Sequence, residues 1–269
     1  MAPSLDAVGY VQGNVPSVPA SRPRIWSVFC YPYFMPRMAR ITLANMPHHV
    51  TQRGNAGQFL LAADSEKNVY LDLLQKYLRL YSVALAGYCL MSNHVHLILV
   101  PGEPDALAVA LKQIHGRFAS FWNATHCSSG HVWQGRFYSC PLDDAHLWIA
   151  LKYVERNPVR AQLVHRPDQW KWSSAAVHCG TQIAPSWLAM NRFSHRWTLQ
   201  AWTDYLAEIE SDAYLRAIRK STHTGRPLGQ EEFVREIEMA TNRILLPRKG
   251  GRPRDGRFAD QQPRLSFVK

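Results

Sequence analysis

Residues 88–101 have the sequence YCLMSNHVHLILVP, which is typical of two neighbouring strands joined by a tight turn. We expect the strands at 83–91 and 94–100. Successive side chains of a strand lie on opposite faces, so His94 and His96 share one face and the apolar residues take the other. One face of this strand should therefore enter a core, while the other carries two imidazoles.

The flanking segments predict a mixed domain. In chain order we expect a strand at 48–53, a helix at 66–81 with Ser65 as its N-cap, a helix at 105–125, a strand or bent ribbon at 131–141 and a helix at 143–156. This order favours an α+β fold, an antiparallel sheet with helices packed on it, over residues 38–180.

The remainder of the chain differs in composition. Residues 1–37 are rich in Pro, Ser, Val and Ala without periodicity, so we expect a flexible leader. Residues 187–246 have a helical pattern and predict a C-terminal helical module. Residues 247–269 are basic and predict a disordered interaction tail.

The charge of the chain favours a polyanionic partner. There are 31 Lys and Arg against 20 Asp and Glu in 269 residues, a formal charge of +11. No apolar run is long enough for a transmembrane helix. Five scattered cysteines without a CxxC pair argue against a disulfide scaffold or a cysteine zinc site, which favours the cytoplasm. No phosphate-binding P-loop motif is present, so we expect no nucleotide cofactor.

Two imidazoles on one strand face can hold a divalent cation. His94 and His96 are two residues apart, and burying both would cost free energy unless each finds a partner. Two exposed or hydrogen-bonded structural histidines are the alternative, and the short HxH pattern does not exclude it.

A second group of polar residues ends the helix at 143–156. Tyr153 and Asn157 are four residues apart, which places them on one helix face. Asn157 could supply an oxygen ligand to a cation held by the histidines. A packed tyrosine and a helix-ending Asn before Pro158 are the alternative.

Together these groups resemble the single-tyrosine HUH nucleases, in which two histidines flank a bulky apolar residue. More narrowly, residues 38–180 resemble the bacterial REP-associated tyrosine transposases. The matching blocks are HHVTQRGN (48–55), YCLMSNHVHLILVP (88–101), GHVWQGRFYSCPLD (130–143) and KYVERNPVRAQLV (152–164). Ser92 departs from the family, which usually has proline there.

The resemblance implies an HUH fold, ferredoxin-like or RRM-like, and a DNA transposase that cleaves and rejoins single strands in hairpin-containing, REP-like DNA. It implies that Tyr153 is the nucleophile, forming a covalent 5′-phosphotyrosine intermediate, and that His94, His96 and Asn157 hold Mg²⁺ or Mn²⁺. The base that deprotonates Tyr153 is not identified, and His146 is a weak candidate. The subunit count stays open between monomer and homodimer.

Two other functions remain open: a catalytically silent regulator that binds DNA hairpins, and a metal hydrolase that uses water as its nucleophile. In each case single-stranded or hairpin DNA would need cations and stacking aromatics. We expect Arg136, in the exposed stretch 134–136, to contact phosphate, whereas most nearby aromatics should be core. Arg252 and Arg254 lie in a Gly-Arg-Pro-Arg segment that resembles a minor-groove AT-hook.

Overall fold

The computed structural model describes residues 39–246, which all belong to one compact unit. The predicted leader and basic tail, with Arg252 and Arg254, lie outside this range. None of the helices in the described range is both long and apolar enough to cross a bilayer.

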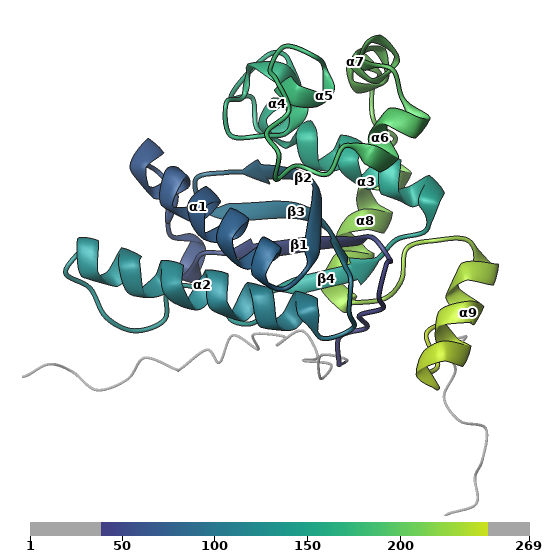
Figure 1. The fold of residues 1–269 in the computed structure, drawn as a ribbon, viewed down its shortest axis with the longest axis horizontal. Coiled ribbons are helices and arrows are strands. Elements are labelled where there is room, and N and C mark those ends of the chain that lie inside the picture. The colour runs from purple at the N-terminus through teal and green to yellow at the C-terminus, as the bar shows by residue number, and fades with distance from the viewer. Residues whose placement is uncertain (1–38, 247–269) are drawn as a thin grey trace, which may run out of the picture. The chain divides into compact units, whose positions relative to one another are not determined.

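The centre of the fold is a four-stranded antiparallel sheet in the order β2-β3-β1-β4 (Figure 1). The strands are β1 (His48–Arg53), β2 (Val83–Leu90), β3 (His94–Pro101) and β4 (Tyr138–Pro141). Helices α1 (Asp64–Leu80) and α2 (Ala106–Thr125) follow β1 and β3. This βαββαβ order is the ferredoxin-like arrangement, and it confirms the predicted α+β fold.

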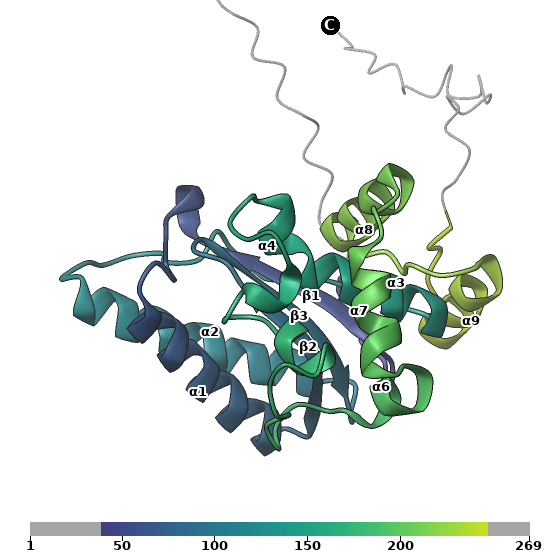
Figure 2. The same ribbon diagram turned by 90° about the horizontal axis from the view of Figure 1, so that it is seen from above.

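The two faces of the sheet are covered by different helices. Figure 2 shows α1 and α2 on one side of the sheet and α3 (Asp144–Glu155) with α8 (Asp212–Thr224) on the other. Val95 and Leu97 of β3 belong to the core under α1 and α2, whereas Ile98 belongs to the core shared with α3. The sheet is therefore buried on both faces.

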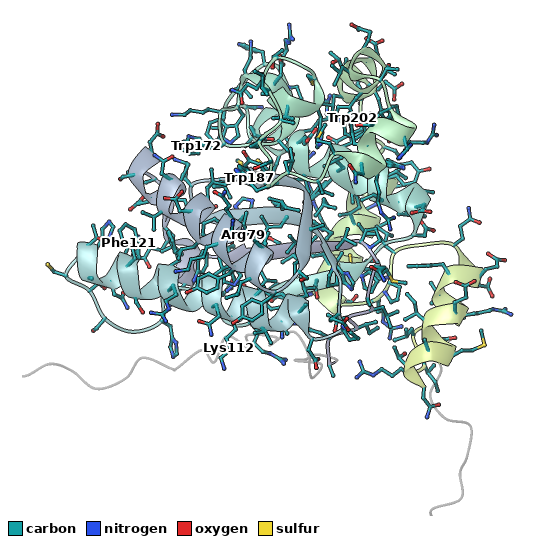
Figure 3. The ribbon with its side chains drawn as sticks, viewed as in Figure 1. Arg79, Lys112, Phe121, Trp172, Trp187 and Trp202 are labelled. Atoms are coloured by element: carbon teal, nitrogen blue, oxygen red, sulfur yellow. The ribbon has the colours of Figure 1, made fainter. Side chains whose placement is uncertain are left out.

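The C-terminal helical extension predicted from the sequence is present. The remaining helices are α4 (Asn157–Arg160), α5 (Ala175–His178), α6 (Asn191–Arg196), α7 (Leu199–Ala207) and α9 (Glu231–Thr241), with short 3-10 turns η1 (Asn55–Gly57) and η2 (Pro167–Gln169). Trp202 of α7 and Ile218 of α8 share a hydrophobic core with Leu151 of α3, so the extension packs directly on the sheet domain. Trp202 is labelled in Figure 3.

Two local predictions were wrong. The strand expected at 131–141 is regular only over Tyr138–Pro141, because Gly135 has a φ of +144° that breaks the extended chain. Helix α1 begins at Asp64 after Ala63 as N-cap, and Glu66 accepts the Ala63 backbone N–H at 2.7 Å. A carboxylate in the first turn thus replaces the hydroxyl cap expected from Ser65.

Helix α3 is held on the sheet by two features of its last turns. At Gly87 of β2 a Cβ atom would lie 2.2 Å from Leu151 Cδ1, so only glycine allows this close approach. Glu155 is fully buried, and its carboxylate accepts hydrogen bonds from the Ser174 hydroxyl (2.6 Å), His178 Nδ1 (2.5 Å) and Trp202 Nε1 (2.9 Å).

We predict that Glu155→Ala lowers the free energy of unfolding by about 3 kcal/mol, because it leaves three buried donors without their acceptor. Urea unfolding followed by circular dichroism measures this. Glu232→Ala, an exposed change on α9, should shift the free energy by less than about 0.5 kcal/mol. Equal unfolding midpoints for Glu155→Ala and the wild type would contradict the prediction.

Buried histidines should make the fold sensitive to acid. Burial lowers the pKa of His48 to about 4, and burial, aided by Arg40, lowers the pKa of His115 to about 3. Between pH 6.5 and 4 these histidines are protonated in the unfolded chain but stay neutral in the folded protein. The free energy of unfolding therefore falls as the pH falls.

We predict a smaller loss of stability over this window in His115→Gln. Each such histidine contributes about 1.4 kcal/mol per pH unit to the slope, and the variant lacks one of them. Urea unfolding at pH 6.5, 5.5 and 4.5 compares the two slopes. The idea fails if the variant and the wild type lose stability in parallel.

Candidate active site

The second face of the sheet carries a row of polar residues on two neighbouring strands. His96 pairs across β3 and β1 with Thr51, and His94 pairs with Arg53. Because His49, Thr51 and Arg53 alternate along β1, they lie on the same face as the two histidines. These five side chains therefore converge at one region of the sheet, opposite the core under α1 and α2.

Both ring nitrogens of His94 have a polar neighbour. Its Nδ1 donates to Asn93 Oδ1 at 2.6 Å, and its Nε2 lies 3.5 Å from the Asn157 side-chain amide. Burial, followed by the charges of Arg53 and Arg160, lowers its pKa to about 4. His94 is thus neutral at physiological pH, with Nε2 available as a ligand.

His96 is more deeply buried. Its Nδ1 lies 2.9 Å from Nε2 of His49, and the two ring centroids are 5.1 Å apart with 7° between their planes. The ring of His94 stands edge-on at 4.9 Å. Burial, with the neighbouring His94 and His49, holds the pKa of His96 well below its usual value. In both histidines Nδ1 is engaged, which leaves Nε2 for the pocket.

Tyr153 of α3 lies over this pair. Its ring centroid is 5.5 Å from that of His96 and 5.7 Å from that of His49. The guanidinium of Arg160 lies 4.2 Å from the ring centroid and donates to the Tyr153 carbonyl oxygen at 2.5 Å. Glu210, at 2.8 Å from Arg160, fixes that guanidinium. The phenol is thus placed beside the imidazoles within one chain, under a cation.

Asn157 is positioned by a break in the helix. Helix α3 ends at Glu155, and the separate turn α4 begins at Asn157 with Pro158 as its next residue. This proline suits the start of a helix, where its missing N–H costs nothing. The structure therefore brings together His94, His96, Tyr153 and Asn157, four residues that sequence analysis had drawn from separate segments.

These groups surround a pocket of about 390 Å³. Its lining comes from β1, β3, β4, α3 and α8: His49, Thr51, Arg53, His94, His96, Gln134, Tyr138, Tyr153, Arg219, Thr222 and His223. Arg53 and Arg219 are exposed at the rim. The pocket therefore combines neutral ligand nitrogens with cationic groups, a combination suited to a phosphate.

Several lining residues were not identified from the sequence. His49 lies in the block at 48–55 and could have been found from its alternation with Thr51 and Arg53. Arg160 lies in the block at 152–164. No local signal indicates Thr222, which reaches the site from a helix more than a hundred residues beyond β3.

The other predicted positions lie around the pocket. Arg136 is exposed, as expected for 134–136, and lines a smaller neighbouring hollow with Tyr138 and His223. His146 does not line the pocket; its Nδ1 bonds to Asp143 at 2.7 Å. Four aromatics of this region are buried in the core, as expected for most of them: Phe118, Trp122, Trp133 and Phe137.

The donor set fits a hard divalent cation only in part. The site offers two neutral imidazole nitrogens and one side-chain amide, which can present its oxygen after a flip. The other coordination positions of a divalent cation would be filled by water and phosphate oxygens. Among residues 39–246, no group of three or more His, Cys, Asp or Glu side chains is arranged to hold a metal ion. Such a set suits Mg²⁺ or Mn²⁺ delivered with a phosphate better than a closed zinc site.

Part of the chain matches a known protein family. Residues 43–157 match the family model described as "Transposase IS200 like", a range that runs from before β1 to Asn157. No curated protein matches the chain at a significant level.

Two solved structures are similar. One is a REP-associated tyrosine transposase bound to a REP hairpin, with 18% identity, coverage of 58% of this chain and 92% of that chain, and a TM-score of 0.47. The other is a candidate transposase from Deinococcus radiodurans R1, with 15% identity, coverage of 45% and 96%, and a TM-score of 0.33.

The matched range contains His94, His96 and Tyr153, which line the pocket, and Asn157, which contacts His94. The resemblance to transposases drawn from the sequence motifs is thereby confirmed. Residues 43–157 of the chain are thus similar to the IS200-like transposases.

Proposed function

We propose that this transposase cleaves and rejoins single-stranded DNA through a covalent bond to Tyr153, and that its substrates are hairpin-containing, REP-like sequences. The observation that carries the proposal is the contact of the Tyr153 ring with His96 in one pocket rimmed by arginines. A phenol, a ligand pair and cations in one place are what phosphoryl transfer to tyrosine requires.

The chain's own ligands would be Nε2 of His94, Nε2 of His96 and the side chain of Asn157. They would hold Mg²⁺ or Mn²⁺, which when bound polarises the scissile phosphate and offsets its developing charge. Both imidazoles are already neutral, so binding needs no proton release from them.

In the chemical step the phenolic oxygen of Tyr153 attacks phosphorus and the bond from phosphorus to the 3′-oxygen breaks. The phenol loses its proton and the departing strand leaves as a 3′-hydroxyl, so the net charge is unchanged. A second 3′-hydroxyl reverses the step and joins new ends. The phosphodiester energy is conserved in the phosphotyrosine bond, so the reaction needs no nucleotide cofactor.

Arg160 supports this role of Tyr153. Its guanidinium faces the ring at 4.2 Å and is held there by Glu210, so a positive charge lies over the phenol ring whose oxygen must become anionic. Within the described residues, no side chain bonds to the phenol hydroxyl, which leaves it facing the pocket.

The arrangement also bears on the other functions. A silent hairpin-binding regulator would have no need of a tyrosine, a ligand pair and a paired arginine in one pocket. A water-based hydrolase would not need the phenol beside the ligands. Because all these groups come from one chain, a single subunit carries every residue that the proposed chemistry needs. We place this activity in the bacterial cytoplasm, on nucleoid DNA.

We predict that Tyr153→Phe abolishes covalent attachment of the protein to DNA, because the attacking oxygen is gone. Incubation of the full chain with 5′-labelled and 3′-labelled hairpin oligonucleotides in Mn²⁺, followed by denaturing gels, detects the adduct. Label should be retained by wild-type protein only on the fragment that carries the 5′-phosphate. Chelation with EDTA should remove the adduct.

Tyr214→Phe, an exposed tyrosine on α8, is the matched control and should form the adduct normally. Hairpin binding by Tyr153→Phe should match that of the wild type. Cleavage that survives in Tyr153→Phe would replace the proposal by the water-based hydrolase, and binding without cleavage by every variant would replace it by the regulator.

We predict that the basic residues outside the pocket set the salt dependence of DNA binding. Each phosphate contact that is lost reduces the slope of log affinity against log salt by about one. Arg136→Gln should therefore reduce the slope by about one, and Arg252→Ala with Arg254→Ala by about two. Fluorescence anisotropy over a salt series measures both.

Arg79→Gln is the control, because Arg79 is exposed on α1, on the side of the sheet away from the pocket (Figure 3). It should leave the slope unchanged. If the control and the test variants behave alike, the three arginines act only through net charge.

A further inference from the structure

A chain of buried hydrogen bonds links the C-terminal helix α8 to the histidine pair. Thr222 Oγ1 lies 2.8 Å from His49 Nδ1, and His49 Nε2 lies 2.9 Å from His96 Nδ1. Thr222 is 3% exposed, His49 1% and His96 6%. These three residues come from α8, β1 and β3, and Thr222 lies outside the range matched by the transposase family.

The bonding groups allow two directions for the protons. In one, His96 Nδ1 donates to His49 Nε2, and His49 Nδ1 donates to the Thr222 hydroxyl. The hydroxyl then has Cys140 Sγ, at 3.4 Å, as a further partner for its own proton. In this direction Nε2 of His96 keeps a free lone pair toward the pocket.

In the reverse direction Thr222 donates to His49, His49 donates to His96, and the proton of His96 sits on Nε2. That nitrogen could then donate a hydrogen bond but could not ligate a cation. The direction of the chain therefore decides whether His96 can serve as a ligand.

We propose that His49 and Thr222 are positioning residues that hold His96 with its proton on Nδ1, so that helix α8 belongs to the active site. This proposal rests on the proposed function only in its claim that the freed Nε2 binds the cation. The ring of His94 is oriented in the same way by Asn93, at 2.6 Å from Nδ1. Both ligand candidates thus have a hydrogen-bond partner at Nδ1. For His94 it is the neighbouring Asn93, and for His96 it is His49, which Thr222 of α8 holds in turn.

The arrangement has a structural consequence for the C-terminal extension. The ring of His49 is nearly parallel to that of His96 and stands edge-on to Tyr153, so a shift of α8 that moves Thr222 would disturb both halves of the site. Removing a partner of this kind typically weakens metal binding 10- to 100-fold. We expect about 10-fold for Thr222→Val, which acts through His49, and more for His49→Phe.

The test uses the full chain labelled with ¹⁵N at histidine. Long-range nitrogen–proton spectra of wild-type protein without metal should report the proton of His96 on Nδ1. In His49→Phe, which keeps a ring for packing, and in Thr222→Val, which keeps the shape, the proton should shift in part to Nε2. Thr222→Ser restores the hydroxyl and should restore the wild-type spectrum.

Titration with Mn²⁺ alone supplies the second readout, since bound manganese broadens the ring signals of its ligands. Half-broadening of His94 and His96 should need about tenfold more Mn²⁺ in Thr222→Val than in wild type or Thr222→Ser. Urea unfolding of each variant establishes that it is folded.

The outcomes separate the two proposals. A wild-type His96 with its proton on Nε2, or variants that match wild type in both spectrum and Mn²⁺ requirement, would overturn the positioning role and leave the tyrosine chemistry standing. Wild-type protein that shows the Nδ1 proton but no broadening by Mn²⁺ and no DNA adduct would overturn the proposed function and leave the hydrogen-bond chain standing.

Discussion

A single buried carboxylate anchors the helix that carries Tyr153. Glu155 ends that helix, and its three hydrogen bonds attach the helix to α5, to Ser174 just before α5, and to α7. A buried, fully paired charge is costly to form and more costly to disrupt, so it fixes one arrangement of its surroundings. Tyr153 lies two residues earlier on the same helix, so these bonds also fix the backbone that places the phenol beside the histidines.

The sheet contributes through the alternation of its side chains. On β3, Val95 and Leu97 fill the core under α1 and α2, while His94 and His96 between them face the pocket. A slip of one residue in the pairing with β1 would exchange these faces, burying both imidazoles among aliphatic side chains. The hydrophobic core therefore enforces the register of the ligand candidates. The same pairing brings His49 beside His96, so stability and site geometry depend on one set of strand contacts.

Much of this could be predicted from the sequence because the signals are local. Strand alternation placed His94 and His96 on one face, and the order of elements predicted the antiparallel sheet. Tyr153 and Asn157 were expected on one continuous helix, whereas the chain breaks after Glu155 and Asn157 begins a separate turn. The errors were also local in origin: a left-handed region at Gly135 shortened the strand expected at 131–141. Thr222 could not be found, because its contact with His49 spans 173 residues and depends on how α8 packs. No periodicity in either segment carries that information.

The C-terminal extension therefore supports the candidate site directly and is not a separate appended module. Glu210 fixes the arginine that covers Tyr153, and Thr222 reaches the histidine behind His96; both lie beyond the matched range, which ends at residue 157. Each of the two catalytic halves thus has a support that the transposase domain does not itself supply. Since α8 also lines the pocket with Arg219 and His223, a conformational shift of this helix would change both the hydrogen-bond chain to His96 and the cationic rim of the pocket.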